Sequence, residues 1–482
     1  MSWETVIGLE VHVQLRTRTK MFCADRTTFG DPPNSNVCPV CLGLPGALPV
    51  PNAEAIRLAV RAALALGCAV HRTSVFARKN YFYPDLPKGY QISQFDQPLA
   101  TGGSASFESS ERGRVRVGIT RLHVEEDAGK LLHDRFPGKT AVDLNRAGIP
   151  LAEIVSEPDL RSPAEARAYL STLRQILVYA GVSDCSMEQG SLRVDANISI
   201  RRPGESRLGT KTEVKNMNSF ANVERALEAE RARQVVLVEA GQRVEQVTLL
   251  FNAATGQVKP TRSKEESHDY RYFPDPDLPP LVLASAWIEE QRSALPELPE
   301  AKRARLETAY GLPAYDARVM TSEPELAEFF ESVVRAGVDP KTAANWVMAD
   351  VMTTYNERGE FPVSAERLAR LIALIREGVL SHQAAKRVYA ELAQAPGEDP
   401  AAVAERLGLV QVSDEGALTG WVDQVLAAHP GEVSRFRNGE TKLMAFFVGQ
   451  VMKRSKGKAD PKGVQPVLQE RLRQPAGSES SR

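Results

Sequence analysis

Acidic and imidazole side chains occupy alternate positions in the segment "VIGLEVHVQL" (residues 6–15). Successive side chains of an extended strand point to opposite faces, so Glu10, His12 and Gln14 share one face. The opposite face is apolar and carries Ile7, Leu9, Val11, Val13 and Leu15. A strand of this design buries one side in a core and presents carboxylate, imidazole and amide groups on the other.

Three further segments repeat this alternation: "ITRLHVE" (119–125), "RVDANISIR" (193–201) and "KTEVK" (211–215). Their polar faces carry Arg121, His123, Glu125, Arg193, Asp195, Asn197, Ser199, Arg201, Lys211, Glu213 and Lys215. A solvated face of an antiparallel sheet explains the alternation, but it does not require Glu, His, Asp and Arg together. Such a face can hold Mg²⁺ while arginines bind substrate phosphates. His12 serves equally as a hydrogen-bonding acid or base, since Mg²⁺ prefers oxygen.

A second group of metal-ligating residue types lies in and before "CPVCLG" (38–43). Cys38 and Cys41 have the C-x-x-C spacing of half a zinc site. The second half is incomplete, because Cys23 is followed by Ala24 and Asp25. Three thiolates with Asp25, or with His71, can complete a tetrahedral zinc site. The alternative is an empty site whose cysteines stay reduced in a turn.

Basic residues are concentrated near the end of the chain. Between Arg435 and Arg473 there are ten Lys or Arg and three acidic residues, a local balance of +7. Exposed basic clusters bind the RNA backbone without reading its sequence, whereas a solvated helix face is the alternative. The candidate RNA-binding residues are Lys453, Arg454, Lys456, Lys458 and Lys462.

The elements that position these residues fall into two kinds. Strand-like stretches and a few helices mix over the first roughly 290 residues, which favours an α+β fold with a largely antiparallel sheet over a regular βαβ alternation. Asn52 and Ser162 are predicted helix N-caps. From about 295 onward, amphipathic helices follow Ser364 and Ser381. We predict three domains: a catalytic cradle domain (1–293), a helical domain (294–408) and a small helical tail domain (409–482) with a disordered end.

The composition is that of a globular protein, with 43% hydrophobic and 25% charged residues. A net charge of -1 means that any RNA contact must be local. Five cysteines without a recognisable signal peptide indicate a reducing cytoplasm, and no apolar run has the length of a membrane span. The chain has no phosphate loop, nucleophile elbow or dinucleotide fingerprint. If ATP binds, its site is therefore of another type.

Eight segments, in one order, resemble the B subunits of the bacterial glutamine-dependent aspartyl/glutamyl-tRNA amidotransferases, the GatB family. They are "VIGLEVHVQL", "CPVCLGLPGALPV", "KNYFYPDLPKGYQISQ", "LHVEEDAGK", "AGIPLAEIVSEPD", "GSLRVDANIS", "TEVKNMNSF" and "SHDYRYFPDPDLPPL", which together run from residue 6 to residue 281. The segment "NGETKLMAFFVGQVMK" and the residues after it are similar to the tail domain of the same family.

The resemblance implies a reaction and partners. Members convert misacylated Asp-tRNA(Asn) or Glu-tRNA(Gln) to Asn-tRNA(Asn) or Gln-tRNA(Gln). ATP activates the side-chain carboxylate as an acyl phosphate, and ammonia then displaces phosphate. The ammonia is released from glutamine by an amidase-type A subunit, and the cytoplasmic heterotrimer is completed by a small C subunit. ATP and Mg²⁺ are the implied substrate and cofactor, and the sequence leaves the choice between Asp-tRNA and Glu-tRNA open.

The resemblance also implies roles for individual residues. The Mg²⁺ ligands of the family correspond to Glu10, His12, Glu125 and Glu153. Lys79 and Glu125 correspond to positions near the exit of an ammonia channel, and Arg193 and Asp195 are further candidates for binding metal or phosphate. Zinc-bearing relatives have Cys-x-Cys where this chain has Cys23-Ala24-Asp25.

A non-catalytic tRNA-binding scaffold is the alternative function. A scaffold needs basic surface but no assembled group of acids and imidazoles. The positions of Glu10, His12 and Glu125 therefore distinguish the two hypotheses.

Overall fold

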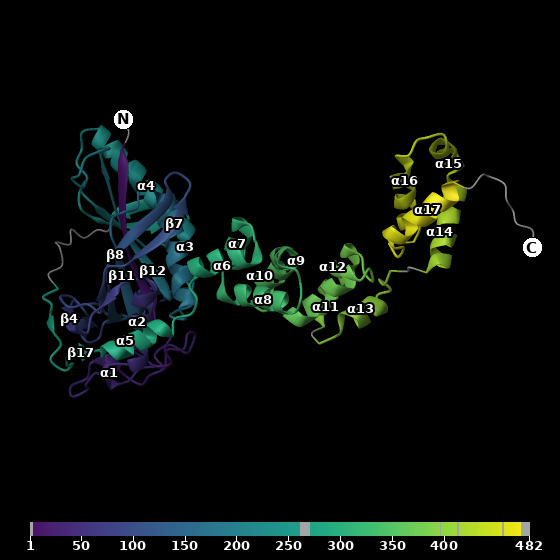
Figure 1. Cartoon of the computed structure of the whole chain (residues 1–482). Helices are drawn as coiled ribbons and strands as arrows, with labels where there is room; N and C mark the ends of the chain where they lie inside the picture. The colour runs from purple at the N-terminus through teal and green to yellow at the C-terminus, as the bar shows by residue number, and fades with distance from the viewer. Residues whose placement is uncertain (1–2, 261–269, 396, 412–413, 456, 474–482) are drawn as a thin grey trace, which may run out of the picture. The chain divides into compact units, whose positions relative to one another are not determined.

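The chain divides into two units, Met1–Ala301 and Lys302–Arg482. The computed structural model describes residues 3–260, 270–395, 397–411, 414–455 and 457–473. Figure 1 shows strands mixed with helices in the first unit and helices along the described part of the second. This confirms the predicted α+β class. No helix among these residues has the length and apolar character needed to cross a bilayer.

A ten-stranded sheet is the centre of the first unit. Its order is β15-β14-β13-β12-β1-β11-β8-β6-β2, with β7 also paired to β8. The described pairs are antiparallel except β13 and β14, which are parallel. The strands are β1 (Glu4–Gln14), β2 (Ala69–Val70), β6 (Ala100–Thr101), β7 (Ser104–Ser109), β8 (Gly113–Glu126), β11 (Pro150–Ser156), β12 (Leu192–Arg201), β13 (Thr212–Lys215), β14 (Thr248–Asn252) and β15 (Gln257–Pro260).

Helices cover the apolar face of this sheet (Figure 1). The core joins apolar residues of β1, β8 and β12 to α2 (Ala53–Ala65), α3 (Pro163–Tyr179) and α4 (Phe220–Glu239). Asn52 caps α2, and Ser162 caps α3 with Pro163 in its first turn, as predicted. Ile7, Leu9, Val11 and Val13 are almost completely buried. The polar residues of β1 therefore face the opposite side of the sheet.

Short strands and helices complete the first unit. A three-stranded sheet has the order β16-β4-β5, and two further pairs are β10-β9 and β17-β3. The bounds are β3 (Thr73–Ser74), β4 (Ala77–Asn80), β5 (Tyr90–Ser93), β9 (Lys130–Phe136), β10 (Lys139–Asp143), β16 (Phe273–Pro274), β17 (Leu281–Val282), α1 (Pro39–Leu42) and α5 (Ser285–Ser293).

The described residues of the second unit form two separate hydrophobic clusters. Residues Leu306–Ala404 supply the first, and Leu418–Leu472 supply the second. The predicted three-domain division, with boundaries at 293/294 and 408/409, stays a prediction. The helices are α6 (Pro299–Tyr310), α7 (Ala314–Met320), α8 (Pro324–Arg335), α9 (Pro340–Trp346), the π-helical turn η1 (Val347–Val351), α10 (Met352–Arg358), α11 (Ala365–Arg376), α12 (His382–Gln394), α13 (Pro400–Arg406), α14 (Glu415–Ala428), α15 (Pro430–Arg437), α16 (Leu443–Arg454) and α17 (Pro461–Arg473).

Candidate active site

The register of the central sheet aligns a row of polar residues across four strands. His12 of β1 pairs with Arg193 of β12 on one side and with Glu153 of β11 on the other. Glu153 pairs in turn with His123 of β8. Directly paired residues have their Cβ atoms about 4.5–5.5 Å apart and share a face. Backbone pairing alone therefore brings these charged and imidazole groups together.

A cavity of about 500 Å³ lies over this row. The main sheet forms one wall, while β4, β5 and the Tyr270–Tyr272 segment supply side chains opposite. All the residues predicted to be catalytic or to bind Mg²⁺ line this one cavity, namely Glu10, His12, Lys79, Glu125, Glu153, Arg193 and Asp195. Glu10, His12 and Glu125, whose positions distinguish a catalytic site from a scaffold, thus lie together.

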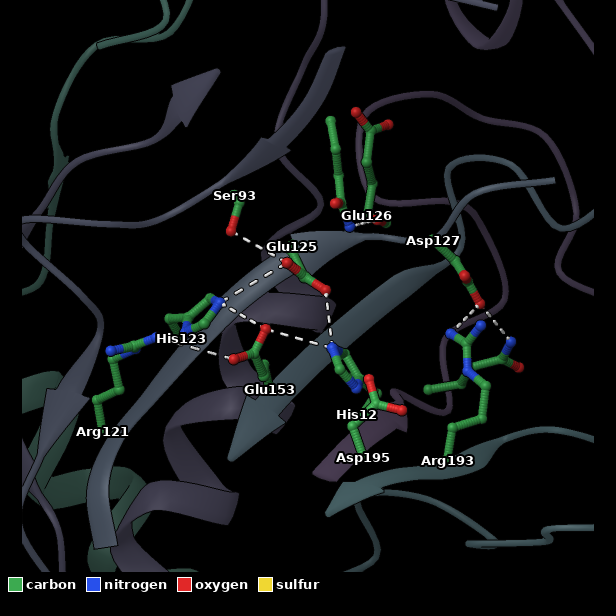
Figure 2. A network of polar contacts seen from close by, with 12 residues as sticks. His12, Ser93, Arg121, His123, Glu125, Glu126, Asp127, Glu153, Arg193 and Asp195 are labelled. Carbon is green, nitrogen blue, oxygen red and sulfur yellow. Dashed lines mark hydrogen bonds and ion pairs between the residues drawn. The ribbon is translucent and has the colours of Figure 1, made fainter. Parts of the chain in front are cut away.

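Two carboxylates and two imidazoles form the buried centre of the cavity (Figure 2). His12 Nε2 lies 3.2 Å from Glu153 Oε2 and 3.6 Å from Glu125 Oε1. His123 Nε2 lies 3.4 Å from Glu153 Oε2 and 3.7 Å from Glu125 Oε2. Ser93 Oγ donates a hydrogen bond to Glu125 at 3.1 Å. Glu125 and Glu153 are only 2% and 7% exposed, so solvent screens these charges little.

Mutual attraction keeps this centre charged in spite of its burial. Burial lowers the pKa of His123, but the carboxylates of Glu153 and Glu125 outweigh it and raise the pKa to about 9. Burial raises the pKa of Glu153, but the two imidazoles overcome that effect and hold it well below its usual value. The pKa of Glu125 is lowered and that of His12 is raised by the same contacts, again against burial.

The donor set fits a divalent cation. One donor atom each from His12, Glu125 and Glu153 lies within 4.8 Å of the others. Each of these atoms is one that divalent cations bind, and a bound cation replaces the protons that now offset the carboxylates. Glu10 lines the same cavity, but its carboxylate accepts a hydrogen bond from Asn197 Nδ2 at 3.1 Å. Burial and then the carboxylates of Glu153, Glu213 and Asp195 raise the pKa of Glu10.

Cationic side chains surround this centre. Arg193 pairs with Asp127 at 2.7 Å, and Lys215 pairs with Asp195 at 2.8 Å. Lys79 Nζ lies 4.8 Å from the centre of the Tyr270 ring. Burial lowers the pKa of Lys79. The negative charge of Glu125, together with that of Glu153 and the nearby tyrosines, outweighs burial and raises this pKa. The cavity can therefore accept anionic groups next to its buried carboxylates.

Sequence reasoning did not assign site roles to several residues that the structure places here, among them His123 and Asp127. His123 shares the polar face of β8 with Glu125, and that alternation was the available signal. Asp127 follows the end of β8 and accepts hydrogen bonds from Gln14 Nε2 and Arg193. The pairing of Asp127 with Arg193 depends on strand order, which the sequence does not reveal.

The predicted zinc ligands also lie together, outside this cavity. Cys41 Sγ lies 3.0 Å from Asp25 Oδ2, 3.6 Å from Cys23 Sγ and 3.8 Å from Cys38 Sγ. The four residues form a group of potential metal ligands. The alternative ligand His71 is instead 2.9 Å from Thr101 Oγ1. A hydrogen bond with Cys23 lowers the pKa of Cys41 to about 6, whereas the same bond raises the pKa of Cys23 and burial raises that of Cys38. Without an ion, these contacts therefore favour the thiolate form only at Cys41.

Four of the five candidate RNA-binding residues lie on exposed positions of the second unit. Lys453 and Arg454 end α16, Lys458 follows it, and Lys462 begins α17. Arg454 Nε donates to Gln424 at 2.7 Å. Lys456 lies outside the described residues, as does the end that was predicted to be disordered, from residue 474 onward.

Together, fold and site define a class: an α+β protein whose largely antiparallel sheet carries a cavity centred on two buried carboxylates and two imidazoles. Residues 5–289 match the GatB/GatE catalytic domain family, and residues 328–472 match the GatB domain family. Similar proteins include the B subunits of aspartyl/glutamyl-tRNA(Asn/Gln) amidotransferase from Geobacter sulfurreducens and from Moorella thermoacetica. Each is 53% identical over 98% of this chain and 100% of its own length. The chain belongs to the GatB family of amidotransferase B subunits, which confirms the resemblance seen in the motifs.

Proposed function

We propose that this chain activates and amidates the side-chain carboxylate of misacylated Asp-tRNA(Asn), Glu-tRNA(Gln) or both, within a ligase complex. A carboxylate oxygen of the aminoacyl group attacks the γ-phosphorus of ATP, and the bond to ADP breaks. Ammonia then attacks the acyl carbon, the carbon–oxygen bond to phosphate breaks, and the nitrogen loses a proton. The products are the amide, ADP and phosphate.

The observation that carries the proposal is the group formed by the half-buried His12 and the buried Glu125 and Glu153, inside a cavity that is also lined by cationic side chains. Both substrates of the activation step are anions, so they repel each other until positive charge is placed between them. His12, Glu125 and Glu153, with Glu10 beside them, would hold Mg²⁺, which would neutralise charge on the phosphates when bound. Arg193 and Lys215 are positioned to add charge around the transferred group.

Lys79 has a separate role in this proposal. Its ammonium group lies within the charge field of Glu125 and against the ring of Tyr270. An aromatic wall with one lysine and one carboxylate can direct ammonia to the acyl carbon, since ammonia is small, neutral and hydrogen bonding. The ammonia is proposed to come from an amidase-type A subunit, with a small C subunit in the complex, because the chain carries no nucleophile motif of its own.

The basic residues of the second unit are proposed to bind tRNA phosphates. The side chains of Lys453, Arg454, Lys458 and Lys462 are exposed around one small hydrophobic cluster. Truncation after about residue 410 is expected to weaken tRNA binding and reduce its salt dependence more than it affects chemistry. Unchanged affinity and unchanged salt dependence would reject this part of the proposal.

Zinc is proposed at the group of Cys23, Asp25, Cys38 and Cys41. Lys20 is completely buried and donates to Cys41 Sγ at 3.3 Å and to the Asn36 carbonyl at 2.7 Å. A buried cation next to three sulfur ligands offsets their combined charge when a divalent ion binds. The donor set therefore fits a structural ion remote from the reaction.

The decisive test uses the reconstituted complex with Glu125→Gln, which keeps the volume and removes the charge. Amide formation on misacylated tRNA should be lost, while glutamine hydrolysis remains measurable. Glu245→Gln is the matched control, because Glu245 is an exposed acid outside the cavity. Amide formation at the wild-type rate in Glu125→Gln would favour the scaffold hypothesis and defeat the catalytic one.

A further inference from the structure

We propose that the rings of Phe95 and Tyr272 form a stacking site for the 3′-terminal nucleobase of the tRNA. This inference rests on the proposed function, because it places the nucleotide that carries the reacting amino acid. Both residues line the active-site cavity. They form part of the wall opposite the main sheet, and the proposed chemistry assigns neither of them a role.

The two rings are already arranged as a stack. Their centroids are 4.1 Å apart and their planes differ by 4°. Tyr270 packs edge-on against Tyr272, with centroids 5.9 Å apart at 74°. Phe95 lines the cavity and is 46% exposed, so its ring is accessible to a ligand there. A flat ligand can extend this stack without displacing any part of the core.

Hydrogen bonds fix the chain next to each of the two rings. Asn80 of β4 donates from its backbone N–H and from Nδ2 to the Tyr270 carbonyl, and from Nδ2 to the Arg271 carbonyl at 2.9 Å. The pairing of β16 with β4 begins at the next ring, Phe273. Gln94 is buried beside Phe95, and its Oε1 accepts from the backbone N–H groups of Leu99 and Val124. A stack fixed in advance loses little entropy when a base binds.

The stack lies close to the reactive centre. Ser93, whose hydroxyl donates to Glu125, is two residues before Phe95. Two residues of extended chain span at most about 7 Å. Lys79, whose pKa the Glu125 carboxylate raises against the effect of burial, also lies against the ring of Tyr270. An amino acid esterified to the terminal ribose can therefore reach the carboxylate–imidazole centre while its base stays on the rings.

Stacking on aromatic side chains is a general way to hold an unpaired base. The strength of such stacking depends little on the identity of the base. The aminoacyl end of tRNA is single-stranded, so its terminal base is available for such contact. Substrates that differ in the tRNA body can thus share this one site.

The test replaces the terminal adenine of tRNA with 2-aminopurine and measures fluorescence with the purified complex, without ATP or glutamine. The wild-type complex should quench the fluorescence, because 2-aminopurine is quenched when it stacks. Tyr272→Leu and Phe95→Leu keep an apolar side chain but remove the ring, so both should abolish most of the quenching. They should also weaken tRNA binding about tenfold, equivalent to about 1.4 kcal/mol.

Two variants control for folding and for general aromatic effects. Tyr272→Phe retains the ring and should behave like the wild type. Phe136→Leu removes a ring of the β9–β10 hairpin that is 51% exposed and outside the cavity, and it should change nothing. Removing the terminal nucleotide should weaken binding to the wild type about tenfold but leave binding to Tyr272→Leu unchanged, because the two changes remove the same contact.

Two results would overturn the stacking site. One is undiminished quenching in both Tyr272→Leu and Phe95→Leu. The other is a raised KM for ATP with unchanged tRNA quenching, which would assign the rings to the adenine of ATP. Because binding is measured without catalysis, quenching by a complex that forms no amide would contradict the proposed function and leave the stacking site supported.

Discussion

Among the described residues of the first unit there are two groups of potential metal ligands, and they are built in different ways. His12, Glu125 and Glu153 come from β1, β8 and β11 of the central sheet, where backbone pairing fixes their spacing. The other group, Cys23, Asp25, Cys38 and Cys41, lies on loops and the one-turn helix α1. Only Cys41 of that group is buried, whereas Glu125 and Glu153 are both buried.

Because they are built differently, the two groups are suited to different roles. A sheet holds its side chains with little freedom, so a site built on paired strands can hold the geometry that a reaction needs. Loops gain order from the ion that they bind, so an ion there contributes to folding instead. We therefore expect substitutions of His12, Glu125 or Glu153 to change the rate of the reaction. Substitutions in the group of three cysteines and Asp25 should change stability instead.

The largest expected effect compares Glu153→Gln with Cys41→Ser in the reconstituted complex. Glu153→Gln should reduce amide formation about 10²–10³-fold, the size of losing one preorganised electrostatic group. Cys41→Ser should leave the rate within about threefold when assayed at a temperature where both variants are folded. Equal losses in both variants would contradict the division between chemistry and stability.

Chelation should produce the next largest effect. Zinc at 100 times its Kd stabilises the folded chain by about 2.7 kcal/mol, so a chelator should lower the thermal midpoint of the wild type. Cys38→Ser should already have the low thermal midpoint of the chelated wild type, and the chelator should change that midpoint little. An identical response of the wild type and Cys38→Ser, measured by calorimetry, would show that no ion is held there.

A carboxylate with a purely structural environment provides a contrast in the second unit. Glu331 is buried and accepts hydrogen bonds from Lys302 and Arg305. Burial raises the pKa of Glu331, but these two cations outweigh burial and lower it below its ordinary 4.5. A lowered pKa adds stability above about pH 4.5 that is lost as the pH falls through the folded value. Glu331→Gln should therefore destabilise α8 by about 2 kcal/mol at pH 7.

Hydrogen exchange of the α8 amides measures this local stability. The difference in local stability between the wild type and Glu331→Gln should become smaller below pH 4.5, the ordinary pKa of the Glu331 carboxyl group. Glu328→Gln is the matched control, since its ion pair with Arg335 is exposed to solvent and should contribute much less to stability. A gap that stays constant with pH would contradict the charge-pairing explanation.

The smallest effect should be a gain in stability. Burial and neighbouring carboxylates raise the pKa of Glu10, so its ionised form is disfavoured in the folded chain. A raised pKa gives stability that is complete below the unfolded value and is lost as the pH rises through the folded value. Glu10→Gln should thus add about 1 kcal/mol at pH 8 in the metal-free protein. A loss of stability in urea unfolding would contradict this.

Much of the fold and site follows from the sequence because alternation is a local property. The polar faces of β1, β8 and β12 were predictable from period-two patterns, and the caps Asn52 and Ser162 from residue type. Glu153 has no such signal, because nearly every residue of β11 is buried. Its role came from the family resemblance alone.

Pairing between distant segments was the part that the sequence could not give. The position of β11 between β1 and β8 sets the contacts of Glu153, and no local pattern encodes strand order. The stack of Phe95 on Tyr272 likewise joins residues 177 positions apart. Such contacts depend on the whole packed structure.

His12, Glu125 and Glu153 are proposed to activate the tRNA-bound carboxylate. The most direct measurement supplies ammonium chloride in place of glutamine, so that amide formation no longer depends on glutamine hydrolysis. The wild-type complex should convert misacylated tRNA to its amide form with ATP, and Glu125→Gln should not, although ammonia is abundant. Amide formation at the wild-type rate by Glu125→Gln under these conditions would contradict the account.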